Sequence, residues 1–159
     1  MGAKGEALAK QFEAKAQEAT ALLEKLSDAD WKKVTDAEKW SVGVTAHHVA
    51  GSHEPIASIV KAVAAGQSIG NFTMDMLNEM NARHAKEHAN CTRAETIALH
   101  TKGAAAAAAA VRGLSDEQLA KSGTVLAGAP PMTAEQVVTG ILIDHVDDHF
   151  GSIRRTVGR

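Results

Sequence analysis

The chain has 159 residues, a length suited to one domain with a sizeable core. Hydrophobic residues make up 45% and aromatic residues only 3%, and the abundant residues are strong helix formers, so we expect an all-α fold. The 17 basic and 19 acidic residues give a net charge of −2 with no basic stripe, which argues against a nucleic-acid-binding protein. The single cysteine, Cys91, excludes an internal disulfide framework and a cysteine-rich zinc site.

The sequence also gives no sign of export or of membrane insertion. The opening stretch, MGAKGEALAKQ, lacks the apolar core of a signal peptide, and no apolar run approaches the length of a transmembrane helix. We therefore expect one cytoplasmic domain over residues 1–159, with neither a membrane nor nucleic acid as partner.

Apolar residues at helical spacing predict a first helix over residues 4–26, which ends at the capping sequence SDADW. A connector containing two tryptophans follows. The second helix should begin at the N-cap Ser41 and run to about Ala65, with a kink at Pro55. A third helix is expected over about residues 73–89.

Three capping boxes organise the second half of the chain. The pairs are Thr92 with Glu95, Ser115 with Gln118, and Thr133 with Gln136. They predict a fourth helix that includes an alanine run, a short helix, and a last helix that reaches about Val157. Because the connections are short, neighbouring helices should pack antiparallel as a bundle. We expect the alanine-rich surface between Gly103 and Val111 to be a contact face of a homodimer.

Two histidines share one face of the predicted last helix. His145 and His149 lie about 40° apart on the face that also carries the apolar residues Val138, Leu142, Val146 and Ile153. Two rings at this spacing can bind one metal ion. The alternative is a pair of core histidines hydrogen-bonded to carbonyl or carboxylate groups, and the spacing alone does not separate the two.

A third ligand would have to come from the second helix. His48 falls at one edge of its apolar face, whereas His47 points nearly opposite and is expected to be solvent-exposed. His53 lies at the other edge and remains an alternative, because the bend at Pro55 makes its direction uncertain.

A rival pair, His84 and His88, has the same four-residue spacing. Charged residues surround it in a last helical turn, where favourable interaction with the helix dipole is a sufficient explanation. His100, near an apolar stripe of the fourth helix, is expected to line the core or a pocket.

The segment WSVGVTAHHVAG and the segment HVDDHFGSI together resemble the DinB/YfiT-like superfamily. That superfamily has Trp-Ser followed by an inward histidine, then a His-x-x-x-His pair followed by Gly and Ile. The stretch LSDEQL is also typical of the region before its last helix. Counted from Trp40, the histidine of the first segment falls at His48.

The resemblance implies an antiparallel four-helix bundle, often a homodimer, that binds one divalent metal through His48, His145 and His149. Members include mycothiol-dependent maleylpyruvate isomerases, bacillithiol S-transferases and metal-dependent hydrolases. Because of two differences, the substrate of these members cannot be assigned to this chain from the resemblance. Phe150 stands where the family often has Arg, and His145 stands where the isomerases can have Glu. The isomerases also usually carry a further C-terminal domain.

Three neutral imidazoles would leave open positions on zinc or nickel for water or for a low-molecular-weight thiol. Asp148, near the edge of the buried face, could orient a ligand or act as a catalytic base, whereas Asp144 and Asp147 fit an exposed acidic patch. The first functional hypothesis is a metalloenzyme that either transfers or adds a thiol to a small molecule, or hydrolyses a small substrate. The alternatives are a non-catalytic, metal-stabilised stress-response or small-molecule-binding bundle, and a structural bundle without metal.

Overall fold

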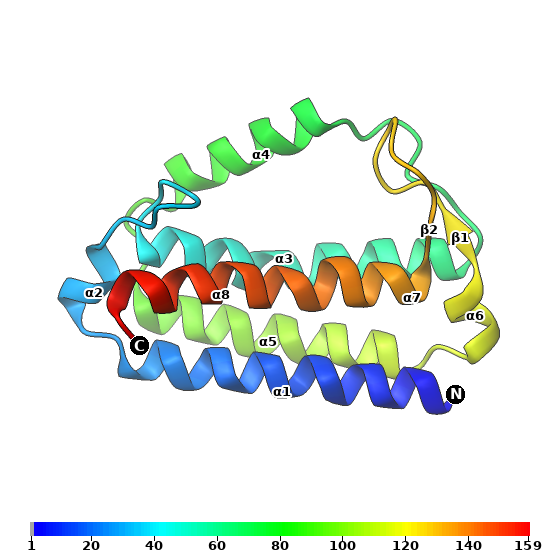
Figure 1. Cartoon of the computed structure of the whole chain (residues 1–159), viewed down its shortest axis with the longest axis horizontal. Helices are drawn as coiled ribbons and strands as arrows, with labels where there is room; N and C mark the ends of the chain where they lie inside the picture. The colour runs from blue at the N-terminus through cyan, green and yellow to red at the C-terminus, as the bar shows by residue number, and fades with distance from the viewer. Residues whose placement is uncertain (1) are drawn as a thin grey trace.

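A computed structural model describes residues 2–159 and shows a predominantly helical protein (Figure 1). The predicted all-α class and four-helix bundle are confirmed. The last helical segment has three consecutive parts. The bundle consists of α1 (Ala3–Lys25), α3 (Val42–Ala64), α5 (Arg93–Arg112), and the last segment formed by α7 (Ala134–Val137), η1 (Val138–Ile143) and α8 (Asp144–Val157).

The chain reaches this arrangement by an indirect path. Helices α3 and α5 run in the same direction, opposite to α1 and to the last segment (Figure 1). Helix α4 (Met74–Glu87) carries the chain back along the outside of the bundle between them. Since α4 runs opposite to both α3 and α5, each of the five long helical segments of the described chain is antiparallel to the next one in the sequence. Within the bundle, however, α3 and α5 lie side by side and parallel.

Short elements complete the connections between the helices. They are α2 (Asp28–Lys32), α6 (Asp116–Ala120), and the strands β1 (Ser122–Gly123) and β2 (Met132–Thr133), which pair antiparallel. An isolated bridge between Val34 and Ser41 closes the loop before α3.

The predicted helix starts are confirmed by their hydrogen bonds. The Ser41 hydroxyl accepts a bond from the backbone N–H of Val44, and all three predicted capping boxes form at α5, α6 and α7. Each cap satisfies backbone donors that the helix itself leaves free, and typically contributes about 1 kcal/mol. The caps therefore fix where the helices of the second half begin.

The core combines large side chains from α1 and the last segment with small ones from α5. Phe12, Leu23, Leu142 and Phe150 are fully buried, whereas α5 contributes mainly alanines to the interior. The small residues allow α5 to approach its neighbours closely, which is the structural role expected of the alanine run.

Two helices differ from expectation. The last helix is not α-helical throughout, since Val138–Ile143 forms a π-helix directly before the histidine pair. Helix α4 contributes no buried residue, and Met74, Met76 and Met80 are about half exposed. Within residues 2–159, no helix combines the length and apolar character that crossing a membrane would need.

Candidate metal centre

Three of the histidines singled out in the sequence come together between two helices. His48 belongs to α3, and His145 and His149 lie one turn apart on α8. One ring nitrogen from each lies within 4.8 Å of the other two. The Nε2 atoms of His48 and His145 are 3.0 Å apart, and the ring centroids of the three residues are 4.6–5.0 Å apart.

The packing of α8 explains why these rings meet. Val146 and Phe150, which flank the histidines in sequence, are buried and hold this face of α8 against the bundle. His145 and His149 lie on the adjoining strip of the helix surface and are only partly buried. The side chain of His149 is 20% exposed, so the cluster opens toward solvent on one side.

A carboxylate that the sequence analysis did not identify holds one of the rings. Glu38 Oε2 lies 2.6 Å from Nδ1 of His149, and Ser152 donates a 2.6 Å hydrogen bond to Oε1 of the same carboxylate. Because an ionised carboxylate only accepts hydrogen bonds, Nδ1 of His149 carries a proton, and in the neutral ring the lone pair is therefore on Nε2. Burial opposes ionisation of Glu38, but hydrogen bonds from Ser152, His149 and Thr35 outweigh it and lower its pKa.

The loop before α3 positions this carboxylate. The bridge between Val34 and Ser41 folds the loop back on itself, and Thr35 donates a backbone hydrogen bond of 2.8 Å to the carbonyl of Trp40. Lys39, next to Glu38, takes a left-handed backbone conformation with φ of 63°. Neither the fold of this loop nor its contact with α8 follows a regular sequence pattern.

The other two rings are neutral at physiological pH. Burial, and then the neighbouring histidines, lower the pKa of His48 and of His145 to about 3. Within the described residues, Nδ1 of His145 is buried without a hydrogen-bond partner, so the protein alone leaves a polar atom unsatisfied. Unprotonated imidazoles backed by a carboxylate form a donor set that fits a divalent transition metal.

The remaining acidic candidates lie outside this cluster. Asp144, Asp147 and Asp148 are exposed on α8, and Asp147 forms an ion pair of 3.2 Å with Lys15. The carboxylate in contact with a clustered histidine is Glu38, and a catalytic role for Asp148 stays a prediction.

His53, the alternative third ligand, belongs to a separate buried pair. Its Nε2 lies 2.9 Å from Nδ1 of His100, and Nε2 of His100 donates a 2.9 Å bond to the Ala16 carbonyl. Nδ1 of His100 must then accept the bond from His53. Burial, with a smaller effect of His100, lowers the pKa of His53 to about 3. The core location expected for His100 is confirmed.

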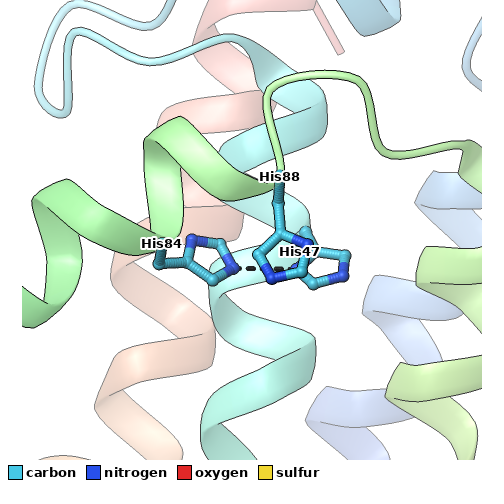
Figure 2. Close-up of side chains that lie close together, drawn as sticks. All are labelled: His47, His84 and His88. Atoms are coloured by element: carbon cyan, nitrogen blue, oxygen red, sulfur yellow. Dashed lines mark hydrogen bonds between the residues drawn. The ribbon is translucent and has the colours of Figure 1, made fainter.

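The prediction that His47 is solvent-exposed is wrong. Its ring is partly buried and packs against His84 and His88 of α4 (Figure 2). The helical periodicity of α3 reports only the direction of the bundle core, whereas α4 covers the opposite side of α3.

The comparisons with known proteins agree with this architecture. The model of the family described as mycothiol maleylpyruvate isomerase N-terminal domain matches residues 12–146. The chain belongs to this family. The resemblance to the DinB/YfiT-like superfamily is thereby confirmed. No match is found among curated proteins.

Solved structures show the same fold at low sequence identity. A crystal structure of the mycothiol-dependent maleylpyruvate isomerase aligns with a TM-score of 0.73 at 15% identity, covering 94% of this chain and 60% of that one. A histidine-to-alanine mutant of the isomerase aligns with a TM-score of 0.74 at 13% identity and the same coverage. The chain thus spans about 60% of the isomerase.

YfiT from Bacillus subtilis, described as a probable metal-dependent hydrolase with an unusual four-helix bundle topology, aligns with a TM-score of 0.69 at 19% identity. The alignment covers 98% of this chain and 86% of that one. The protein is therefore a DinB-like helical bundle, and within residues 2–159 its histidines come together in two groups of three.

Proposed function

We propose that this protein is a metalloenzyme that binds one divalent transition metal, zinc or nickel, through His48, His145 and His149. The observation that carries the proposal is the convergence of three imidazole nitrogens from α3 and α8, with Glu38 behind one of them. A carboxylate that fixes the ring of a ligand histidine is the usual outer partner in such sites.

In the proposed reaction, a low-molecular-weight thiol is transferred to, or added to, a small electrophilic substrate. The family of the chain and its likeness to the mycothiol-dependent isomerase support this choice over hydrolysis. A bound metal would supply positive charge that keeps a thiol, or a water molecule, in its nucleophilic deprotonated form. Hydrolysis is the second candidate, favoured by the likeness to YfiT.

The residues of the chain have distinct tasks in this proposal. Glu38 accepts a hydrogen bond from Nδ1 of His149 and so leaves Nε2 as the nitrogen available to a metal. His48 and His145, held neutral by burial, present unprotonated nitrogens at physiological pH. The side chain of His149 is partly exposed, so one side of the cluster is open to solvent, as a catalytic site requires and a structural site closed by four protein ligands does not.

Replacement of each ligand tests the proposal. Protein purified without a histidine tag should lose one metal ion per chain in His48→Ala, His145→Ala and His149→Ala, because two imidazoles bind an ion far more weakly than three. Plasma mass spectrometry gives the metal content, and circular dichroism checks the fold. The control is Asp144→Asn on the exposed side of α8, which should keep the metal content of the wild type.

The metal-loaded protein should then be assayed with mycothiol or bacillithiol and maleylpyruvate, and with small esters as the hydrolytic arm. Thiol-dependent turnover that disappears in His145→Ala supports the proposal. Unchanged metal content in all three histidine variants would contradict the site, and ester hydrolysis without thiol dependence would select the second candidate.

A further inference from the structure

A second group of three histidines lies on the other side of α3. His47 comes from α3, and His84 and His88 come from the last turn and the C-cap of α4 (Figure 2). One ring nitrogen from each lies within 4.8 Å of the other two. None of these residues belongs to the group formed by His48, His145 and His149.

The three rings are in close contact. Nδ1 of His47 lies 2.8 Å from Nε2 of His84, the contact drawn as a dashed line in Figure 2. The rings of His47 and His88 are stacked, with centroids 4.1 Å apart and planes 22° from parallel. Two nitrogens bound to one tetrahedral ion at about 2.0–2.1 Å would lie roughly 3.3 Å apart. The observed spacing therefore needs only small ring movements to accept an ion.

Favourable interaction with the helix dipole does not explain this arrangement. Such a role would place His84 and His88 in solvent as separate cations. Instead, both rings pack against a third imidazole, and stacked cationic rings would repel each other. The 2.8 Å contact also requires an unprotonated nitrogen on one of its two rings. The contact between His47 and His84 therefore does not fit two cationic rings.

Two further observations describe the surroundings of these rings. Nδ1 of His84 is buried and has no hydrogen-bond partner within residues 2–159. Burial, and then the neighbouring His88, lower the pKa of His47, and the carboxylate of Glu95 in the capping box of α5 opposes this shift. An ion held at the cluster would bind the nitrogens that face one another, such as Nε2 of His84, and would leave Nδ1 of that ring as its N–H donor.

The position of α4 gives such a site a clear structural consequence. Helix α4 contributes no buried residue to the core, so little apolar packing holds it to the bundle. An ion shared by α3 and α4 would join the two helices directly. Because His47 precedes His48 and the rings of His48 and His84 are 5.7 Å apart, α4 would then be fixed beside the first group.

We propose that His47, His84 and His88 form a second divalent transition-metal site, for an ion such as Zn²⁺, Ni²⁺ or Cu²⁺, that fastens α4 to α3. Three imidazole ligands suit these ions. The second site would bind its ion whether or not the first group of histidines is catalytic. The two sites are adjacent but share no ligand.

Metal stoichiometry is the first test. Metal-free, untagged protein is titrated with Zn²⁺ by calorimetry, and bound metal is counted by plasma mass spectrometry after desalting. The wild type should bind two ions per chain. His88→Gln and His145→Gln should each bind one, and the double variant none. One ion in the wild type that is lost in His145→Gln and kept in His88→Gln would overturn the proposal.

Hydrogen exchange of the α4 amides is the second test, because it distinguishes the loss of a metal site from a loss of folded structure. With free Zn²⁺ at about 100 times its dissociation constant, exchange through undocked α4 should slow about 100-fold in the wild type. The slowing should persist in His145→Gln and disappear in His88→Gln. Because α4 lies outside the core, His88→Gln should keep the helical content of the bundle. Exchange rates in α4 that do not respond to Zn²⁺ would overturn the proposal.

Discussion

Glu38 determines which nitrogen of His149 is available to a metal. The 2.6 Å contact with Nδ1 fixes the tautomer, and the bond from Ser152 fixes the carboxylate in turn. A neutral amide in place of the carboxylate would keep the shape of the side chain but would pair with Nδ1 more weakly, and it could present its NH₂ group to a ring that must donate.

We therefore expect Glu38→Gln to weaken metal binding at the first group by about 10–100-fold, the usual effect of losing such a partner. Competition against a chelator of known affinity gives the dissociation constant. The matched control is Asp144→Asn, which removes an exposed carboxylate from α8 and should leave the affinity unchanged. Equal effects of the two substitutions would mean that only overall charge matters.

The sequence predicted part of this site for a physical reason that also explains what it missed. His145 and His149 share a helix face, so their spacing alone places them together. Glu38 lies 111 residues from His149 in an irregular loop, where no periodicity predicts direction. His47 was placed wrongly because the periodicity of α3 reports the bundle core and carries no information about α4.

Helices α1 and α5 approach closely at a glycine. A Cβ atom at Gly5 would lie 2.7 Å from the carbonyl oxygen of Leu114 and 2.9 Å from that of Val111. Both are backbone atoms, one in the last turn of α5 and one just after its C-cap, so the backbones themselves would have to move apart. In contrast, a Cβ at Gly51 in α3 would have its nearest neighbour at 3.8 Å.

These two glycines should respond oppositely to alanine. Gly5→Ala should destabilise the protein by about 1–3 kcal/mol through overpacking. Gly51→Ala should stabilise it by up to about 1 kcal/mol, because alanine is the better helix former and the site has room. Urea unfolding followed by circular dichroism measures both. Destabilisation by Gly51→Ala would show that exposed helix propensity does not govern this position.

Helix starts were predictable because a cap is a local signal of four residues, and the pairs at Thr92, Ser115 and Thr133 all form. The π-helical stretch was not predictable, since Val138–Ile143 has an ordinary apolar helical pattern. The outer position of α4 was also not predictable, because its Leu77 and Met80 suggest a buried stripe although the helix buries none of its residues.

The protein as a whole buries neutral histidines, and this makes its stability depend on pH. His53 is 1% exposed, and its folded-state pKa of about 3 lies below the value of about 6.5 expected in an unfolded chain. Between these two pH values the unfolded chain binds a proton that the folded protein does not. The contribution of His53 is therefore complete above pH 6.5 and is lost as the pH falls toward 3.

We expect the free energy of unfolding of metal-free protein to fall by about 1.4 kcal/mol per pH unit for each such histidine below pH 6.5, or about 2 kcal/mol from His53 by pH 5. His48 and His145 should add to the slope in the same direction. Urea unfolding at pH 7.5, 6 and 5 with a chelator measures this. His53→Gln, whose amide can still donate to His100, should give a shallower slope. A stability that is constant from pH 7.5 to 5 would contradict the buried neutral state.

The fold also limits which surfaces remain for another copy of the chain. Of the alanine-rich region expected to form a dimer contact, Gly103, Ala104, Ala107, Ala108 and Val111 are buried within the chain. Only the outer strip, which includes Ala105, Ala106 and Ala109, is exposed. A homodimer through α5 stays a prediction, and it would have to use this narrower strip.

The π-helical stretch has a consequence for how the length of the last helix can change during evolution. A turn that closes i→i+5 bonds holds one residue more than an α-turn, so loss of one residue between Val138 and Ile143 would restore regular α-helix there. Both flanking segments would keep their facing. A single-residue deletion between His145 and His149 would instead turn one ring about 100° away from the other. A gap in an alignment of this helix with its relatives therefore belongs in the π segment, where a change in length leaves the two histidines on a common face.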